Sequence, residues 1–334
     1  MDIVLDIVRG GRGLDGGEEA RQVEGTTGMK VGVIIGISED GDTGESPRYA
    51  DVRASALAAE AAGLDAVWLY DHLVYRFGEP PVTRGTWEAW TLLSALAEAT
   101  TRAELGVLVM CVPFRNPAVL AKMADTLDEV SGGRFTLGLG AGWHQPEFDA
   151  FGIPFDNKVS RFEDGVKIIA PLLREGKVDH RGTYASAPDC ELRPRGPRPG
   201  GPPILIASFG PRMLRLTAEH ADLWNVAWLG DPSALDEPLA KLHAACDEVG
   251  RDRASLGITV GITVRFPDLL PAPEPDAAAP DPAKVISGTV EDVAVALRGY
   301  AERGAVQVIV NLDPADETGY ARLAEAAAMS RTPA

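Results

Sequence analysis

The chain of 334 residues is long for one ordinary domain and suits a decorated α/β barrel, whose usual size is about 250 residues or more. Its formal net charge of -17, from 49 acidic and 32 basic residues, argues against a nucleic-acid partner and favours a soluble cytoplasmic protein. Three scattered cysteines suggest neither a disulfide framework nor a zinc site, and no apolar stretch approaches the roughly 20 residues of a membrane-spanning helix.

The first 28 residues are predicted to be an extension, with a single barrel domain covering residues 29–334. Gly11, Gly13 and Gly16 form a formal G-x-G-x-x-G after a strand-like run. The helix that a dinucleotide-binding turn needs is missing, because the following segment breaks within two turns and a better strand starts at Met29. We therefore expect a disordered leader here rather than a Rossmann turn.

From residue 29 onward, apolar runs of strand length alternate with amphipathic helical segments. Proline marks two helix starts, at Ser46-Pro47 and Asn116-Pro117, and Gly63 ends the first helix. The predicted strands are 30–35, 65–70, 105–112, 134–142, 203–208, 222–228, 256–266 and 306–311. The predicted helices are 46–62, 86–100, 116–130, 160–174, 211–220, 232–249, 290–303 and 317–329.

Eight strands that alternate with eight helices predict an α/β fold, the parallel (β/α)8 TIM barrel, because each parallel strand must return through a crossover and the ring closes at eight. The active site is then expected at the C-terminal ends of the strands, together with insertions on that face. Two connections are long, 176–202 and 267–284. We expect the first to form part of the pocket wall, and the second has the composition of a mobile segment.

The fourth predicted strand has large apolar residues on one face and is almost bare on the other, with Gly138, Gly140 and Gly142. Glycine within a strand costs about 0.5–1 kcal/mol relative to alanine, so this run needs a reason. One reason is a ligand lying close to the backbone, and the other is a tight corner in a crowded barrel. The spacing is not the dinucleotide fingerprint, because bulky Trp143 and His144 follow in place of a helix N-terminus.

Two other strand ends carry reactive side chains. The second strand ends at Asp71 and His72, and one of them should face the barrel mouth. A histidine there can relay protons, since its ordinary pKa is about 6.5, and the alternative is a structural histidine that is hydrogen-bonded at a strand end. Cys111 ends the third strand, where a buried structural thiol is favoured over a nucleophile because no histidine is near in sequence.

The fifth strand is followed by a turn of small residues and a proline that opens a helix. Such a turn presents free backbone N–H groups at a helix N-terminus, and Arg212 adds positive charge. The turn from Ser208 to Arg212 is therefore a candidate phosphate site. An ordinary helix cap is the alternative.

Four segments carry a family resemblance: GLDAVWLYDHL, FRNPAVLAKMADTLDEVSGGR, SGGRFTLGLGAGWHQPEFDAFGIPF and IASFGPRMLRLTAEHADLWN. In this order they resemble the bacterial luciferase-like superfamily of flavin and deazaflavin barrels, over nearly everything from Met29 onward. The GAGW run with the acidic Glu147 after it, and the DH pair, most resemble the branch that uses coenzyme F420. The resemblance implies a (β/α)8 barrel with an insertion before the later strands.

The resemblance also implies site roles. His72 would be the acid/base beside the hydride-accepting carbon of the cofactor, and a non-prolyl cis peptide would lie near Leu108 and Val109, behind the ring. The end of strand six, from Asn225 to Trp228, is a further contact region, where Trp228 differs from the smaller residues often found in relatives. This difference either narrows the substrate pocket or disturbs the match. The implied cofactor-binding residues are Asp71, Leu108, Val109, Gly140, Ala141, Gly142, Trp143, Ser208, Phe209, Gly210, Pro211, Arg212 and Ala227; no metal ligand is implied.

These expectations predict an oxidoreductase that transfers a hydride between F420 and a small organic substrate, in a chain whose relatives are commonly homodimers. One alternative is a monooxygenase that uses FMNH2 and O2 and depends on a separate flavin reductase. Another is a barrel that binds a flavin or phosphate ligand without turnover. F420 carries an anionic oligoglutamate tail, so cations should gather at the rim. The candidates, for which surface salt pairing is the alternative, are Arg115, Lys158, Arg161 and Arg212.

Overall fold

The computed structural model describes residues 28–41, 43–271, 281 and 283–332. The glycine motif at residues 11–16 and nearly all of the predicted N-terminal extension lie outside the described residues. So does the middle of the second long connection, residues 272–280 and 282.

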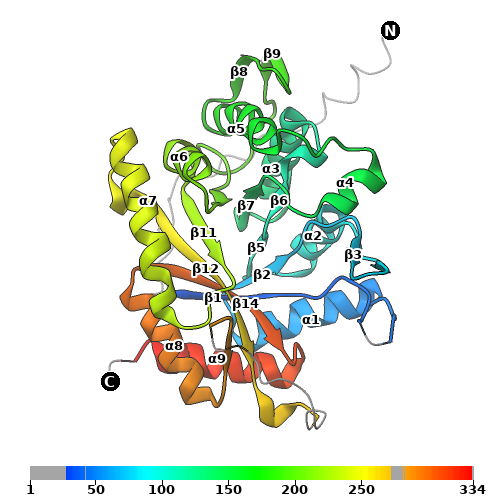
Figure 1. Ribbon diagram of the computed structural model, residues 1–334, viewed down its shortest axis with the longest axis vertical. Coiled ribbons are helices and arrows are strands. Elements are labelled where there is room, and N and C mark those ends of the chain that lie inside the picture. The colour runs from blue at the N-terminus through cyan, green and yellow to red at the C-terminus, as the bar shows by residue number, and fades with distance from the viewer. Residues whose placement is uncertain (1–27, 42, 272–280, 282, 333–334) are drawn as a thin grey trace, which may run out of the picture.

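A closed ring of parallel strands forms the centre of the molecule, which confirms the predicted TIM barrel (Figure 1). The third strand position is occupied by two short strands in succession, and pairing of the fourth strand with the fifth completes the ring. The eight positions are β1 (Lys30–Ile34), β2 (Ala66–Leu69), β5 (Glu104–Val107) with β6 (Met110–Cys111), β7 (Phe135–Gly140), β10 (Ile204–Ala207), β11 (Leu223–Ala227), β12 (Gly257–Arg265) and β14 (Ala305–Asp313).

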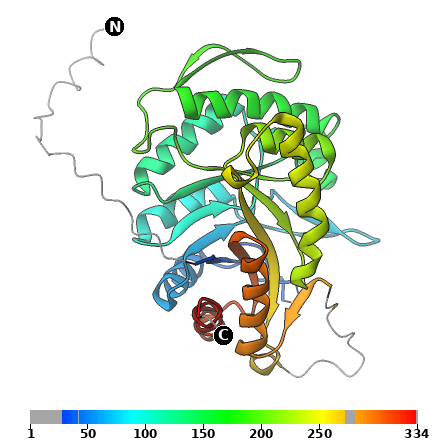
Figure 2. The ribbon, with the colours of Figure 1, turned by 90° about the vertical axis from the view of Figure 1, so that its left-hand side faces the viewer.

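Helices pack around the outside of this ring (Figures 1 and 2). The predicted cap at Asn116 is confirmed, because its side chain accepts the N–H groups of Ala118 and Val119 at 3.0 and 3.1 Å. The first helix begins three residues later than Ser46-Pro47 predicted. Within the described residues the α-helices are α1 (Tyr49–Ala62), α2 (Ala89–Ala99), α3 (Pro117–Val130), α4 (Gln145–Phe151), α5 (Lys158–Glu175), α6 (Pro211–His220), α7 (Asp236–Val249), α8 (Val290–Glu302) and α9 (Glu317–Ser330).

Several short elements were not predicted. α4 follows β7 directly, and β13 (Val285–Ser287) pairs with the end of β12. Two antiparallel hairpins are inserted, β3 (Tyr75–Phe77) with β4 (Val82–Arg84), and β8 (Lys177–Arg181) with β9 (Ser186–Glu191). In the part of the chain that the structure describes, the 3-10 helices are η2 (Val112–Phe114), η3 (Pro232–Leu235), η4 (Arg253–Ser255) and η5 (Pro267–Leu269).

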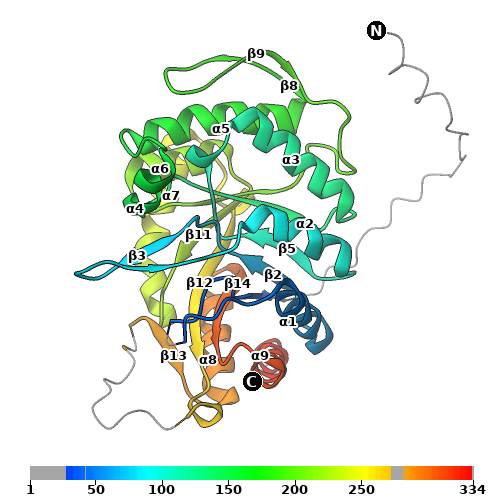
Figure 3. The same cartoon turned by 90° about the vertical axis from the view of Figure 1, so that its right-hand side faces the viewer.

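The two hairpins lie in different kinds of connection (Figure 3). The β3–β4 hairpin projects from the connection that leads from β2 to α2, on the face of the strand C-termini. The β8–β9 hairpin leads from α5 to β10 and runs along the outer side of α5. A connection from a helix to the next strand starts at the opposite end of a parallel barrel, so the prediction that residues 176–202 form the pocket wall was wrong.

The lower part of the barrel interior is closed by side chains. Trp68 is fully buried there, within a small apolar cluster that includes Ile34, Leu205 and Ile309. A Cβ on Gly106 would overlap the Trp68 ring, so this strand passes close to the indole because it has no side chain. The large apolar side chains of β7 point outward into the helix-covered core, as predicted. Within the described part of the barrel, the open space therefore lies at the C-terminal ends of the strands.

Candidate active site

A cavity of about 660 Å³ opens at the C-terminal ends of the strands, where a TIM barrel carries its active site. Residues from five strand positions converge on it, and most are apolar or aromatic. The lining residues are Tyr70, Asp71, His72, Tyr75, Leu108, Val109, Cys111, Gly142, Trp143, Glu147, Ala207, Phe209, Asn225, Ala227 and Trp228.

His72 and Glu147 form a hydrogen-bonded pair at one side of this cavity. The Nδ1 atom of His72 lies 3.0 Å from Oε1 of Glu147, and the other carboxylate oxygen accepts the Leu73 N–H at 2.9 Å. The Glu147 side chain is 2% exposed and that of His72 13%. Because a carboxylate only accepts, Nδ1 carries the proton and Nε2 is left without a partner among the described residues.

Aromatic rings surround this pair. The ring of Tyr75 lies 4.5 Å from that of His72, and the indole of Trp143 meets His72 edge-on at 5.7 Å. Burial, together with the Glu147 charge, raises the pKa of Tyr75, and burial also raises the pKa of Tyr70. Both phenols therefore face the cavity as neutral hydroxyl groups at neutral pH.

Asp71 also lines the cavity, but protein groups already engage both of its oxygens. Arg115 binds them in a bidentate pair at 2.7 and 2.9 Å, and the Cys111 N–H adds a bond of 2.8 Å. Burial raises the pKa of Asp71, and Arg115 opposes that shift. Arg115 is further bound to Glu88 at 2.6 Å, so it belongs to a partly buried ion-pair network and not to the rim cations that the sequence suggested.

The floor of the cavity is the interrupted third strand. The peptide bond between Leu108 and Val109 is cis, as the resemblance implied. Val109 covers the bare face of the fourth strand: a Cβ on Gly140 would lie 2.5 Å from its Cγ2, and one on Gly138 would overlap the Val107 carbonyl oxygen. Close packing of two strands, the second of the two reasons considered, therefore explains Gly138 and Gly140, and the implied ring contact at Gly140 is covered by Val109.

Gly142 borders the cavity and has a different reason to be glycine. Its φ of +79° is left-handed, and a Cβ would lie 2.5 Å from the Phe148 ring and 2.8 Å from the Cys111 sulfur. The backbone turns here to carry Trp143 to the cavity and α4 behind it. Cys111 is buried in this contact, and burial raises the pKa of its thiol, as befits the structural role that the sequence favoured.

The candidate phosphate turn is exposed and precedes α6. The Ser208 hydroxyl is buried and pairs with the Thr217 hydroxyl at 2.8 Å, so it faces the helix and not the cavity. Gly210 caps α6 without a side-chain bond, which leaves backbone N–H groups of the first turn for a ligand. Arg212 is paired with Glu163 at 3.0 Å, and the two hydrogen-bonded cations beside Glu163 lower its pKa to about 2.

The predicted site residues therefore fall into two groups. Eight line the cavity: Asp71, His72, Leu108, Val109, Gly142, Trp143, Phe209 and Ala227. Gly140, Ala141, Ser208, Gly210, Pro211 and Arg212 lie behind or beside it. Of the remaining rim cations, Arg161 pairs with Asp156 at 3.1 Å, and Lys158 lies over the Phe155 ring.

Several lining residues are not among the implied cofactor-binding residues, and Asn225, which lies in the strand-six contact region that the resemblance implied, is the most informative of them. Its Nδ2 donates to the Thr259 hydroxyl at 2.9 Å, and that hydroxyl donates to the Trp224 carbonyl. The Thr259 proton is thereby used, so the amide orientation is fixed and Asn225 Oδ1 is a buried acceptor without a partner in the described structure. The available signal was its position two residues before Ala227, because alternate residues of a strand point to the same side.

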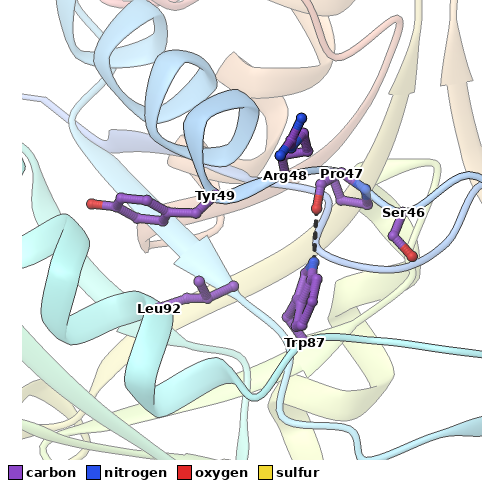
Figure 4. Close-up of a pocket in the computed structure, with 6 residues that line it drawn as sticks. All are labelled: Ser46, Pro47, Arg48, Tyr49, Trp87 and Leu92. Carbon is purple, nitrogen blue, oxygen red and sulfur yellow. Dashed lines mark hydrogen bonds between the residues drawn. The ribbon is translucent and has the colours of Figure 1, made fainter.

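A second hollow of about 480 Å³ lies beside the β1 and β2 connections (Figure 4). Tyr49, Leu92 and Trp87 line it, and Trp87 donates to the Pro47 carbonyl at 2.7 Å. It contains no acid, base or nucleophile apart from the phenol of Tyr49 and the hydroxyl of Ser46. Of these two hollows, the 660 Å³ cavity, with His72 and Glu147 in its wall, is therefore the candidate active site.

Comparison with known proteins identifies the family. Residues 29–268 match the family model described as luciferase-like monooxygenase, and the chain belongs to this family of oxidoreductases. It is 31% identical over 250 residues to a pyrimidine monooxygenase, RutA, of Methylobacterium radiotolerans, a match that covers 70% of this chain and 64% of the relative. The RutA of Cronobacter turicensis is 29% identical over 241 residues, 68% of this chain and 63% of the relative. The chain thus spans less than two thirds of these relatives.

The solved structures that share this fold include an F420-dependent enzyme and a monooxygenase. An F420-dependent secondary alcohol dehydrogenase in complex with an F420–acetone adduct superposes with a TM-score of 0.74 at 18% identity, over 91% of this chain and 100% of that one. The EDTA monooxygenase of a Chelativorans species gives 0.73 at 16% identity, over 90% and 93%. At these identities the likeness establishes the barrel and leaves the cofactor open. No helix in the described part of the chain is long and apolar enough to cross a membrane.

Proposed function

We propose that this protein transfers a hydride between coenzyme F420 and a carbon of a small organic substrate, with His72 as the acid/base. The observation that carries the proposal is the His72–Glu147 pair, with Nδ1 and Oε1 3.0 Å apart, at the wall of a 660 Å³ aromatic cavity. A histidine whose Nδ1 proton is held by a buried carboxylate presents Nε2 as a base. An F420-dependent secondary alcohol dehydrogenase has the same fold, so a barrel of this kind can hold this cofactor.

The residues at the cavity fit a flat heterocycle with a phosphate-bearing side chain. Leu108 and Val109 provide an apolar floor, and the unpaired Oδ1 of Asn225 would accept a ring N–H. The exposed first turn of α6 would hold a phosphate through backbone N–H groups. When bound, F420 supplies the carbon that accepts or donates the hydride.

The protein then has three tasks. The apolar floor and the surrounding rings hold the two reacting carbons in contact and exclude water. Nε2 of His72 takes the hydroxyl proton of a substrate that is oxidised, or gives a proton to a carbonyl that is reduced. Glu147 keeps the imidazole in one tautomer and stabilises its protonated form, and so acts as a positioning residue.

A second candidate is an FMNH2-dependent monooxygenase that uses O2 and a partner reductase. The names of its relatives favour this candidate, because the family model and the relative at 31% identity are both named monooxygenases. The pairing of Arg115, Arg161 and Arg212 with carboxylates also leaves fewer free cations for an oligoglutamate tail. The same floor, acceptor and phosphate turn would serve FMN.

Direct titration separates the candidates. Purified protein is titrated with F420 and with FMN, each oxidised and reduced, while fluorescence is followed. Micromolar binding of F420 is the expected result, and binding of FMN alone would overturn the cofactor choice in favour of the monooxygenase. His72→Asn should then bind the cofactor fully and lose turnover. Full binding with no turnover from any donor in the parent protein would favour the non-catalytic barrel.

A further inference from the structure

Trp228 has a backbone conformation that tryptophan rarely adopts. Its φ is +64°, in the left-handed region. The other described non-glycine residues with positive φ are Asn157 and Asp189, whose short polar side chains tolerate this region. A bulky residue held there marks a position where the surrounding structure imposes the conformation, and such positions cluster at ligand sites.

The left-handed turn changes the direction of the Trp228 side chain. Along β11, Asn225 and Ala227 line the cavity, whereas Trp224 and Val226 point into the outer core. An extended residue 228 would continue this alternation and point outward. Trp228 instead lines the cavity, with its ring 6.3 Å from that of Tyr70. Its N–H donates to the Gly261 carbonyl at 2.8 Å, which holds the turned backbone in place.

Trp228 completes a rim of exposed rings. Trp143, Phe209 and Trp228 come from three different strand ends and are 60%, 61% and 42% exposed. Trp143 also contacts the His72 ring, so the rim is continuous with the proposed acid/base. Large apolar side chains that gather around a cavity and stay exposed to water indicate a surface that a ligand covers.

We infer that Trp228 is a specificity-determining residue that selects substrates with a flat aromatic or heteroaromatic ring. The indole lines the cavity and is still 42% exposed, so an aromatic ring that enters the cavity would stack on it, and a saturated ring of the same size would not. The inference rests on the proposed function only in placing the substrate beside His72. It requires neither F420 nor FMN in particular.

The test uses two neutral alcohols of equal carbon skeleton, 2-naphthylmethanol and its decahydro analogue. Binding of each is measured by calorimetry, with the protein alone and with its cofactor bound. We expect the aromatic alcohol to bind about two- to tenfold tighter, the range that an aromatic contact supports. Trp228→Leu should abolish this preference, and Trp228→Phe should retain part of it. Equal affinities in the parent protein, or an unchanged preference in Trp228→Leu, would overturn the inference.

Two controls keep the test independent of folding and of the cofactor. Trp87→Leu removes an exposed indole from the second hollow (Figure 4) and should leave the preference intact. Trp228→Gly should melt at a higher temperature than Trp228→Ala, because glycine adopts φ of +64° without strain; the reverse order would contradict an imposed conformation. Failure of the proposed function appears separately, as absence of cofactor binding in the parent protein.

Discussion

The two inserted hairpins each lie beside a histidine–carboxylate pair, and the pairs are alike in their contacts. His72 lies 3.0 Å from Glu147, which also accepts the Leu73 N–H at 2.9 Å. His180 lies 3.3 Å from Asp164, which also accepts the Tyr184 N–H at 2.7 Å. The first pair borders the 660 Å³ cavity, and the second lies on the outer side of α5. A histidine–carboxylate contact alone therefore does not mark an active site.

The difference between the pairs comes from the kind of connection that carries each hairpin. The β3–β4 hairpin follows a strand, so it emerges at the face where all the strand C-termini meet. The β8–β9 hairpin follows a helix and folds back along it. Burial follows location: the carboxylate of Glu147 is 2% exposed and that of Asp164 15%. The position in the barrel, and not the composition of the loop, decides which insertion meets the substrate.

The largest expected difference between the two pairs is in turnover. Glu147→Gln keeps one acceptor oxygen, which can serve the Leu73 N–H, but it replaces the other oxygen with an NH2 group and removes the negative charge beside His72. We expect the rate of cofactor oxidation by substrate to fall about 10²-fold or more, because positioned acid–base catalysis contributes about 10²–10⁴. Cofactor affinity, measured by fluorescence, should stay the same. Asp164→Asn is the matched control with unchanged turnover, and equal losses in both variants would refute the comparison.

The next effect concerns two glycines with the same φ of +79°. Gly142 lies at the mouth, and Gly176 lies where the second hairpin begins. Alanine in the left-handed region costs about 1–2 kcal/mol at either position. At Gly142 the added Cβ also meets the Phe148 ring and the Cys111 sulfur, whereas at Gly176 it meets the far end of the long Arg195 side chain. Overpacking adds about 1–3 kcal/mol, so the urea midpoint should fall more for Gly142→Ala. Equal shifts of the two midpoints would mean that the structure around Gly142 accommodates the added Cβ without a further loss of stability.

Sequence patterns predicted the barrel well because its elements follow simple periods. Alternating or continuous apolar runs indicated the eight strands, and caps such as Asn116 indicated helix starts. The hairpins were not predicted because they have no such pattern: the β3 strand is three residues long, and β8 reads KVDHR, with charged residues on one face and a single apolar residue, Val178, on the other. Strands this short or this polar give no apolar period to detect.

The candidate site was partly predictable for the same reason. His72 was found because position along a strand fixes which end a residue occupies. The unpaired Oδ1 of Asn225 depends on Thr259 of the next strand, and the inward turn of Trp228 depends on a single dihedral angle. The glycine run allowed two explanations until the contact of Val109 with Gly140 was known. Contacts between strands decide these points, and a local pattern does not contain them.

Acidification should affect the first hairpin through His144. Its Nε2 accepts the Arg76 N–H at 3.0 Å, and burial lowers its pKa, with Glu147 opposing and His72 adding to the shift. The folded state therefore disfavours the charged ring. The stability that this preference contributes is complete above the ordinary pKa of about 6.5 and is lost as the pH falls below it.

A variant that keeps the acceptor but cannot become charged isolates this effect. His144→Gln should reduce the fall in melting temperature between pH 7.5 and pH 5.5, by on the order of 1–3 °C in a chain of this size. His144→Leu removes the acceptor and should lower the melting temperature at pH 7.5 as well. If His144→Gln and the parent protein lose stability in parallel, the contact between His144 and the hairpin is not the acid-sensitive point.

The smallest expected effect lies at the second pair. Asp164→Asn keeps one oxygen for the Tyr184 N–H but weakens the bond and removes the charge next to His180. Replacing the charged acceptor of such a hydrogen bond with a neutral one costs about 1 kcal/mol. Because only the hairpin tip depends on it, the change should appear as faster hydrogen exchange at the Tyr184 amide, with no change in the affinity for F420 or FMN. Weaker binding of the cofactor in this variant would show that the outer side of α5 is coupled to the cavity. The two hairpins would then belong to one site.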